Sequence, residues 1–401
     1  MTTSTDTPTN RPLEDTTVIE LGHIAAGPFC SLLLAELGAD VIKIEHGASG
    51  GDSVRGGTPV GNSLFNAVNR NKRGISLDLK TDGGMEAFRD LITTADVFVE
   101  NLRPGAPEKL GIGYDDLRNV NPELVYCSIK GFNEGPYEDY PALDPVAEAL
   151  SGLMSVTGHP DKSPARAGTS VADMTAALFG AFGITAALRQ REHTGTGQHV
   201  TAPLFESTVS LMGYWLVYAQ AYDTRPEPLG AGHDNWAPYD VYQTTDDRWV
   251  FVGPSSQAQW ERLCEALGLQ LHEEDRFETV DDRRRNEDAL DDELQGVIGK
   301  LTADELVEGL HDVGVPVAPV QNVDEVPADE HLAATDALGE IETAEGESTS
   351  VSVPKLPLRS SQFQRPEPTD PPELGADTDA VLRDLGYSDA EIESLRNSGC
   401  L

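Results

Sequence analysis

The sequence predicts an α/β protein with two domains: a large Rossmann-like domain built on a parallel sheet, and a smaller α/β domain. Between residues 17 and 130, short β-type runs alternate with helical runs, which is typical of a parallel sheet covered by helices. At residues 226–230 the run PEPLG interrupts this pattern, and the composition then shifts. The expected boundaries are therefore 1–225, 226–322 and 323–401.

Each expected element follows from local composition. Short β-type runs predict strands of the large domain at 17–21, 40–45, 74–79, 97–100, 125–129 and 200–203. Apolar residues at helical spacing predict helices at 29–37, 85–93 and 204–222, and a long helix that follows Ala172 and ends before Gly195. The small domain is expected to hold strands at 240–244 and 249–253, and helices at 257–267, 286–300 and 303–313.

One acid, Asp173, stands at the start of the long helix. The run Ser170-Val171-Ala172-Asp173 fits a capping box, so spacing alone favours a structural role. A carboxylate at a helix N-terminus is stabilised by free N–H groups and the helix dipole. We therefore expect Asp173 to stay ionised, as a carboxylate nucleophile must.

Composition limits the classes of function. The chain has 401 residues, with 68 acidic against 29 basic ones and a net charge of −39, which excludes a nucleic-acid binder. Only eight of the basic residues are lysine, which favours adaptation to high salt over an ordinary acidic protein. Molar salt shortens the screening length to about 3 Å and removes most of the self-repulsion.

Membranes, metals and disulfides are not expected. No uninterrupted apolar run has membrane-spanning length, and the N-terminus is polar. The sequence therefore predicts no membrane span and no signal peptide, and we expect a cytoplasmic location. The four cysteines form no CxxC or Cys/His cluster, which argues against a structural metal or a disulfide framework.

The first strand is followed by Gly22-His23-Ile24-Ala25-Ala26-Gly27-Pro28 rather than the GxGxxG fingerprint. A ligand can still bind at the helix N-terminus beyond such a strand. Cations recur in the segments next to the strands, where each alone would be solvated surface. In a chain this acidic, they together favour a cradle for an anionic cofactor; they are Arg70, Lys72, Arg73, Arg103, Lys109 and Lys130.

The chain contains ALSG at 149–152, TG at 157–158, Ala172-Asp173, and TGTGQ at 194–198. Together these motifs resemble those of the family III (CaiB/BaiF) CoA-transferases, and the similarity extends from residue 17 to residue 401. The resemblance implies that Asp173 is the nucleophile. NRNKR at 69–73 and ENLRPG at 100–105 are similar to motifs that line the family's CoA site. The residues thereby expected to contact CoA are His23, Ala26, Arg70, Lys72, Arg73, Asn101, Leu102 and Arg103, with Lys109 and Lys130 as further cations.

Two departures concern the nucleotide contacts: Ala25 and His46 stand where one branch of the family has Gln and Arg. The glycine-rich run with Gly230, Gly232 and His233 resembles a segment that folds over the site, although a flexible linker has the same composition. The C-terminal segment resembles the family pattern in which the tail returns to the large domain and two chains interlock as a homodimer.

The resemblance implies transfer of CoA from an acyl-CoA to a free carboxylic acid, with CoA thioesters as substrates and no permanently bound cofactor. The chain looks closest to halophile members that act on succinyl-CoA and mesaconate, so small dicarboxylates are expected. Two alternatives remain: an acyl-CoA racemase of the same fold, or a non-catalytic CoA-binding protein. The racemase branch has a catalytic histidine where this chain has Leu143, which disfavours two-base proton transfer.

Overall fold

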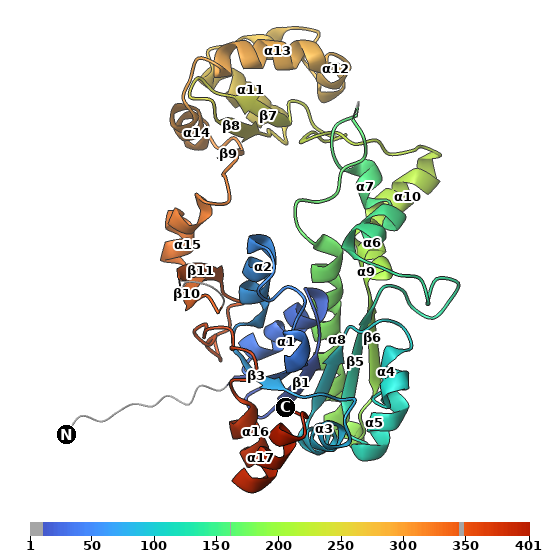
Figure 1. Ribbon diagram of the computed structural model, residues 1–401. Coiled ribbons are helices and arrows are strands. Elements are labelled where there is room, and N and C mark those ends of the chain that lie inside the picture. Colours follow the sequence, from blue (N-terminus) through green and yellow to red (C-terminus); the bar gives the residue numbers. More distant parts are fainter. Residues whose placement is uncertain (1–10, 161, 345–348) are drawn as a thin grey trace, which may run out of the picture. The chain divides into compact units, whose positions relative to one another are not determined.

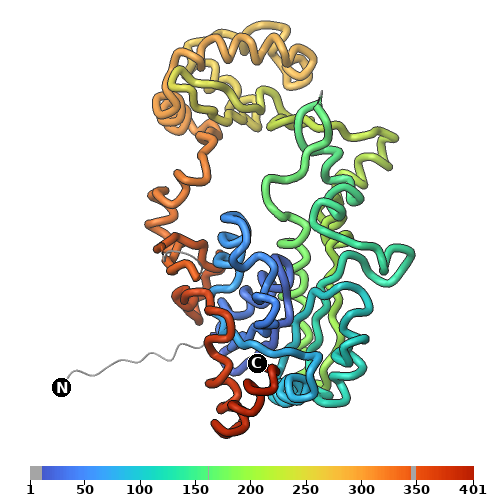
Figure 2. The backbone as a smooth tube through the Cα atoms, viewed as in Figure 1, coloured from blue at the N-terminus to red at the C-terminus, as the bar shows by residue number. Residues whose placement is uncertain are grey.

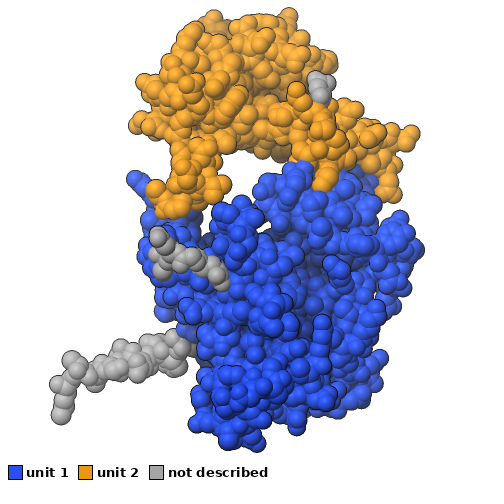
Figure 3. Space-filling view, viewed as in Figure 1, with its two compact units in different colours: residues 1–153, 166–217, 330–401 blue, residues 154–165, 218–329 orange. Residues whose placement is uncertain are grey.

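The computed structural model describes residues 11–160, 162–344 and 349–401, which form two compact units. Unit 1 comprises residues 1–153, 166–217 and 330–401, and unit 2 comprises residues 154–165 and 218–329 (Figure 3). The short insert 154–165 thus belongs with the second unit, and the C-terminal residues belong with the first. Each unit is described by itself below.

The centre of unit 1 is a six-stranded parallel sheet in the order β3-β2-β1-β4-β5-β6 (Figure 1). Its strands are β1 (Thr17–Leu21), β2 (Asp40–Glu45), β3 (Lys72–Ser76), β4 (Val97–Glu100), β5 (Val125–Lys130) and β6 (His199–Pro203). The predicted parallel sheet is confirmed. The strand order reverses between β1 and β4, and in open α/β sheets ligands bind at the carboxyl ends of the strands beside such a reversal.

Helices cover both faces of this sheet. In β1, Val18 belongs to a core with helices α1 (Ala26–Glu36) and α8 (Val171–Thr194), whereas its neighbour Ile19 belongs to a core with α3 (Asp82–Thr94). This alternation follows from the two-residue period of a strand. The remaining helices before α8 are α2 (Pro59–Asn69), α4 (Ala106–Leu110), α5 (Tyr114–Val120), α6 (Asp144–Ser151) and α7 (Leu153–Val156).

The helix expected at 204–222 is interrupted, which corrects the prediction. It forms α9 (Leu204–Leu211) and α10 (Gly213–Tyr222), with Met212 as the C-cap of α9. Gly213 begins the second helix, and the low helix propensity of glycine, about 1 kcal/mol below that of alanine, favours a break at this point. Apolar periodicity predicted the helical conformation but not the break.

Helix α8 is long and apolar enough to cross a membrane, although the sequence predicted no membrane span. An 18-residue stretch of this helix has a mean hydropathy of 1.6, and half of that stretch is buried inside the fold. Because this buried half packs against α1 and the sheet, we assign α8 as a core helix of unit 1.

The C-terminal part of unit 1 packs beside β3. It contains α15 (Glu330–Ala334), the antiparallel pair β10 (Leu338–Glu342) and β11 (Ser350–Pro354), α16 (Thr378–Asp384) and α17 (Asp389–Asn397). Asp377 accepts a hydrogen bond from the Gly74 amide at 2.7 Å, and the Tyr387 hydroxyl donates to Asp90 at 2.6 Å. The chain therefore ends on the same layer as β3 and α3.

Unit 2 is a small α/β unit with its own core around the fully buried Trp260. Its antiparallel sheet has the order β7-β8-β9, with β7 (Asp240–Gln243), β8 (Trp249–Val252) and β9 (Val317–Pro319). Its helices are α11 (Gln257–Ala266), α12 (Val280–Arg285), α13 (Glu287–Ile298) and α14 (Ala303–Asp312). Figure 2 traces the longer segment of this unit, residues 218–329, as one continuous run of the chain; residues 154–165 form its other segment.

Candidate active site

The N-terminus of α8 is held by an acid from another helix. Ser170 is the N-cap residue, but its side chain makes no capping hydrogen bond, so the predicted capping box is wrong. Instead, Asp144 Oδ1 accepts the amide hydrogens of Ala172 at 2.8 Å and of Asp173 at 3.2 Å. Asp144 is the first residue of α6 and is buried. A carboxylate therefore caps α8, but it comes from residue 144.

Local sequence explains why Asp144 can do this. Pro145 follows it in the first turn of α6, where proline is compatible with a helix start. The preceding Leu143 is extended and exposed, so the chain turns into the helix at the acid. The Arg166 guanidinium lies 3.5 Å from Asp144 Oδ2 and partly balances its charge.

Asp173 is half-buried, and its electrostatic environment is unfavourable to a charge. Burial, followed by the nearby charge of Asp144, raises the pKa of Asp173 to about 7, while Arg166 acts in the opposite direction. This corrects the expectation that Asp173 is fully ionised. The helix N-terminus favours the anion, but desolvation and the second carboxylate outweigh it. Near neutral pH, Asp173 therefore exists in both protonation states.

Glu148, one turn after Asp144 on α6, is a third acid in this cluster. Its side chain is fully buried, and Oε2 accepts the Ala167 amide hydrogen at 2.8 Å. Burial and the Asp144 side chain raise the pKa of Glu148. Sequence reasoning missed both Asp144 and Glu148. The run DPVAEALSG contains their only signal, an acid before a proline and a second acid four residues later.

The loop between β1 and α1 lies where the strand order reverses, and Asn101 holds it. The His23 amide donates to Asn101 Oδ1 at 2.8 Å, and Asn101 Nδ2 donates to the His23 carbonyl at 2.9 Å. Ile24 adopts a φ of 67°, which is rare for a β-branched residue, and its amide donates to the Asp52 carboxylate. Ala26 begins α1 directly after this loop. Strained backbone of this kind is typical of functional loops.

A fully buried ion network lies behind the loop. Lys43 Nζ is 2.9 Å from Glu20 and 3.2 Å from Asp52, and Lys72 Nζ is 2.7 Å from Glu20. Burial opposes ionisation of Glu20, but the two ammonium groups outweigh it and hold the pKa of Glu20 at about 2. Through Asp52, this network connects the third strand to the strained amide of Ile24.

The structure separates the predicted cations into two groups. Lys72 is buried with Glu20, Arg70 is buried against Glu36, and Arg73 pairs with Asp40 and Asp384. These three therefore face the protein's own carboxylates. Arg103 and Lys109 are exposed, and Lys130 is half-buried. The Leu102 amide donates to Glu100 at 2.8 Å, which shapes the loop after β4.

The glycine-rich segment belongs to unit 2 and is ordered by contacts within that unit. Gly230 has a φ of 66°, and its amide donates to the Gly158 carbonyl at 2.8 Å. The Gly232 amide donates to the carbonyl of Leu229. The His233 ring packs on Trp236 with ring centroids 4.2 Å apart. A movement of this segment over the site stays a prediction.

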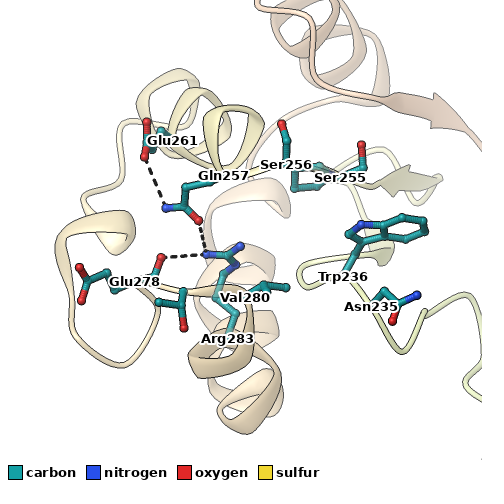
Figure 4. A pocket seen from close by; sticks show the side chains of 11 residues that line it. Asn235, Trp236, Ser255, Ser256, Gln257, Glu261, Glu278, Val280 and Arg283 are labelled. Atoms are coloured by element: carbon teal, nitrogen blue, oxygen red, sulfur yellow. Dashed lines mark hydrogen bonds between the residues drawn. The ribbon is translucent and has the colours of Figure 1, made fainter.

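Unit 2 also contains a pocket of about 570 Å³ that includes none of the residues predicted from the sequence (Figure 4). Trp236, Ser255 and Ser256 face it, and the guanidinium of the buried Arg283 donates to Gln257 Oε1 at 3.1 Å and to the Glu278 carbonyl at 3.2 Å. The arginine is therefore hydrogen-bonded to other groups of the protein.

Comparison with known proteins identifies the family to which this chain belongs. The family described as CoA-transferase family III matches residues 13–378. An acetyl-CoA:oxalate CoA-transferase from Acetobacter aceti is 34% identical over 397 residues, which cover 98% of this chain and 100% of the relative. A succinyl-CoA:mesaconate CoA-transferase from Haloarcula hispanica is 34% identical, with 87% of this chain and 90% of the relative covered.

A solved structure agrees with these relatives. The crystal structure of a CaiB/BaiF family protein from Brucella suis matches with a TM-score of 0.86 and 33% identity, covering 94% of this chain and 100% of that chain. The chain therefore belongs to CoA-transferase family III, and the protein is a CoA-transferase with the fold of the CaiB/BaiF proteins.

Proposed function

We propose that the protein transfers CoA from succinyl-CoA to a small dicarboxylic acid such as mesaconate, with Asp173 as the covalent carrier. The observation that carries this proposal is the position of Asp173: a half-buried acid at the start of α8, beside a second carboxylate, in the segment that matches the family's nucleophile. The choice of acids is supported by the succinyl-CoA:mesaconate relative from Haloarcula hispanica.

The proposed route keeps the thioester energy on the enzyme. The Asp173 carboxylate attacks the succinyl-CoA carbonyl, and CoA leaves as a thiolate, which forms a mixed anhydride. The thiolate then attacks the Asp173 carbonyl, so succinate leaves and an aspartyl-CoA thioester remains. The acceptor carboxylate repeats these steps in reverse, which forms the new CoA ester and regenerates Asp173. Water must be excluded, because hydrolysis of either intermediate would lose the thioester.

The raised pKa of Asp173 suits a carboxylate nucleophile. A carboxylate with a pKa of about 7 is a stronger nucleophile than an ordinary aspartate with its pKa near 3.8. It must lose its proton before it can attack, so transfer should increase as the pH rises through about 7. The N–H groups at the start of α8 are held by Asp144, which fixes the backbone of the nucleophile.

We assign the CoA site to the carboxyl ends of β1 and β4. His23, Ala26, Asn101 and Leu102 form the loops there, and Arg103, Lys109 and Lys130 supply cations that can attract the phosphates of CoA. Arg70, Lys72 and Arg73 support these loops from behind, because their charges are paired with internal carboxylates.

We also propose that the protein is a cytoplasmic homodimer that is active in molar salt. Helix α8 exposes Leu178, Phe179 and Phe182, and Tyr214 and Val217 are exposed on α10. Such apolar area favours cover by a second copy, and the net charge of −39 favours high salt. We expect a dimer in about 2 M KCl and a loss of activity in dilute buffer, measured by light scattering and turnover. A monomer, or full activity without salt, would contradict the respective half.

One experiment tests the covalent route and the two alternatives. Enzyme is incubated with succinyl-CoA and no acceptor, and is then treated with hydroxylamine or borohydride. Peptide mapping across residues 167–189 should find the aspartyl hydroxamate or the reduced product on Asp173. Adding mesaconate should produce a new CoA ester, which neither a racemase nor a binding protein would make. An unmodified Asp173 under conditions of rapid exchange would refute the covalent route.

A further inference from the structure

Glu148 has one oxygen without a partner. The side chain is fully buried, Oε2 accepts the Ala167 amide hydrogen at 2.8 Å, and Oε1 is buried with no hydrogen-bond partner. A charged carboxylate that is half satisfied in this way is unfavourable in a protein interior. The neutral acid would instead carry a hydrogen that needs an acceptor.

The acceptor is provided by helical spacing. Asp144 and Glu148 are four residues apart in α6, so their side chains share one face of the helix. The Asp144 oxygens are already turned toward the start of α8 and toward Arg166. The charged groups that act on Glu148 are Asp144 from its own helix and Arg166 from the segment before α8. The negative neighbour raises the pKa of Glu148 and the arginine lowers it, after the larger effect of burial.

We propose that Glu148 is a positioning residue for CoA transfer: it stays neutral, and its Oε1–H donates to Asp144 and holds this carboxylate against the amides of Ala172 and Asp173. Glu148 does not touch the reacting atoms. It acts through Asp144, whose two acceptor bonds fix the first turn of α8 and whose charge raises the pKa of the nucleophile. The inference rests on the proposed function of Asp173.

The protonation state of Glu148 has a consequence for Asp173. A neutral Glu148 adds no charge to the cluster and withdraws electron density from Asp144 through the hydrogen bond. A charged Glu148 would add another anion near Asp173. Replacement by glutamine, which is neutral and can donate, therefore distinguishes the two states.

The experiment compares Glu148→Gln with Glu148→Leu in the full-length enzyme. The pH dependence of kcat and of kcat/KM for succinyl-CoA is measured, together with the amount of CoA trapped on Asp173. For E148Q we expect kcat within about twofold of wild type and an unchanged acid limb of the pH–rate profile. For E148L we expect kcat to fall about tenfold, KM to stay constant, and the acid limb to move to higher pH, because Asp144 loses its donor.

A spectroscopic readout and a control complete the test. The infrared difference spectrum of wild type against E148Q should contain the C=O band of a protonated carboxyl group, which a purely structural role would not require. Asp291→Asn is the matched control, because Asp291 is an acid of unit 2 whose pKa is also raised by burial. It should change neither the pH profile nor the trapping.

The outcomes separate the inference from the proposed function. If Asp173 is trapped normally but E148Q moves the acid limb down by about one pH unit, Glu148 is charged and the inference is refuted alone. An E148L enzyme with wild-type kcat and pH profile would also refute it. If E148L does not fold, E148Q and the infrared band still decide. An untrapped Asp173 in wild type would refute the covalent route, and the inference with it.

Discussion

Two groups of buried acids in unit 1 have opposite surroundings. Glu20, in the network behind the β1–α1 loop, lies between two lysines, and these hold its pKa at about 2. Asp173, at the start of α8, lies beside Asp144, and its pKa is raised to about 7. The first arrangement stabilises the fold and fixes a loop. The second makes the charged form of a carboxylate unfavourable, which is the pattern expected of a nucleophile.

The difference also reverses the dependence of stability on pH. For Glu20, the folded pKa is below its ordinary value of 4.5, so its contribution is present above that value and is lost as the pH falls toward 2. For Asp173, the folded pKa is above its ordinary value of 3.8, so ionisation destabilises the fold progressively as the pH rises from about 4 to 7. Substitutions at the two sites should therefore have opposite effects on stability.

The largest effect is expected for Asp173→Asn. Without the proposed nucleophile, transfer should fall by about 10⁴-fold or more, while the thermal unfolding temperature at pH 8 should rise because a half-buried charge beside Asp144 is removed. The stability gain should be smaller at pH 5, where the wild-type acid is protonated. Turnover and calorimetry at both pH values measure this. Glu192→Gln, at the exposed far end of α8, serves as the control. Normal turnover in a folded D173N enzyme would exclude Asp173 as nucleophile.

Glu20→Gln tests the other site. Removing the charge leaves Lys43 and Lys72 without their shared carboxylate, and breaking a buried ion pair in this way costs about 3–5 kcal/mol in unfolding free energy. Denaturant unfolding in high salt measures the loss. Glu393→Gln removes an exposed partner of Arg396 and should cost less than about 0.5 kcal/mol. Equal losses in the two variants would show that the buried network stabilises the fold no more than an exposed ion pair does.

Asp144→Asn should bring the pKa of Asp173 closer to that of an ordinary aspartate. The variant keeps an oxygen that can accept from the α8 amides but removes the charge that raises the pKa of Asp173. The acid limb of the pH–rate profile should move down by about one unit, with only a moderate change in kcat at pH 8. Asp115→Asn, an exposed acid that pairs with Arg118, is the control and should leave the limb in place. A limb that does not move would mean that burial alone sets this pKa.

The smallest effect is expected for Asn101→Ala. It removes both hydrogen bonds to His23, worth about 1–2 kcal/mol together, and so loosens the β1–α1 loop. KM for succinyl-CoA should rise severalfold while kcat changes little. The matched control is Asn119→Ala, because Asn119 is exposed on α5 and bonds only within its own helix. Unchanged KM in the N101A enzyme would argue against CoA binding at this loop.

Part of this comparison could be predicted from the sequence. Short β-type runs predicted six strands for the main sheet, although the third was expected at 74–79 and lies at Lys72–Ser76, because its first residues are charged. The break at Gly213 was missed because apolar periodicity continues across it. Helix α2 was missed as well, because its run PVGNSLFNAVN mixes a few apolar residues with glycine and asparagine.

The candidate site was predicted unevenly. The family motif identified Asp173 as the expected nucleophile, but neither its capping nor its protonation state, because both depend on Asp144, which is 29 residues earlier in the chain. Asp144 and Glu148 have the spacing of a solvated helix face, so only their burial distinguishes them from surface acids. Similarly, the pairing of Lys72 with Glu20 joins residues 52 positions apart and is created by the sheet.

The most direct test of the central claim is the pH dependence of covalent labelling at Asp173. Enzyme and succinyl-CoA are mixed without acceptor at a series of pH values, quenched after a single turnover, and trapped together at one pH before peptide mapping. We predict that the CoA adduct forms on Asp173 and that its initial rate increases with a midpoint near pH 7. An adduct rate that is constant above pH 5, or an adduct on another residue, would contradict the account.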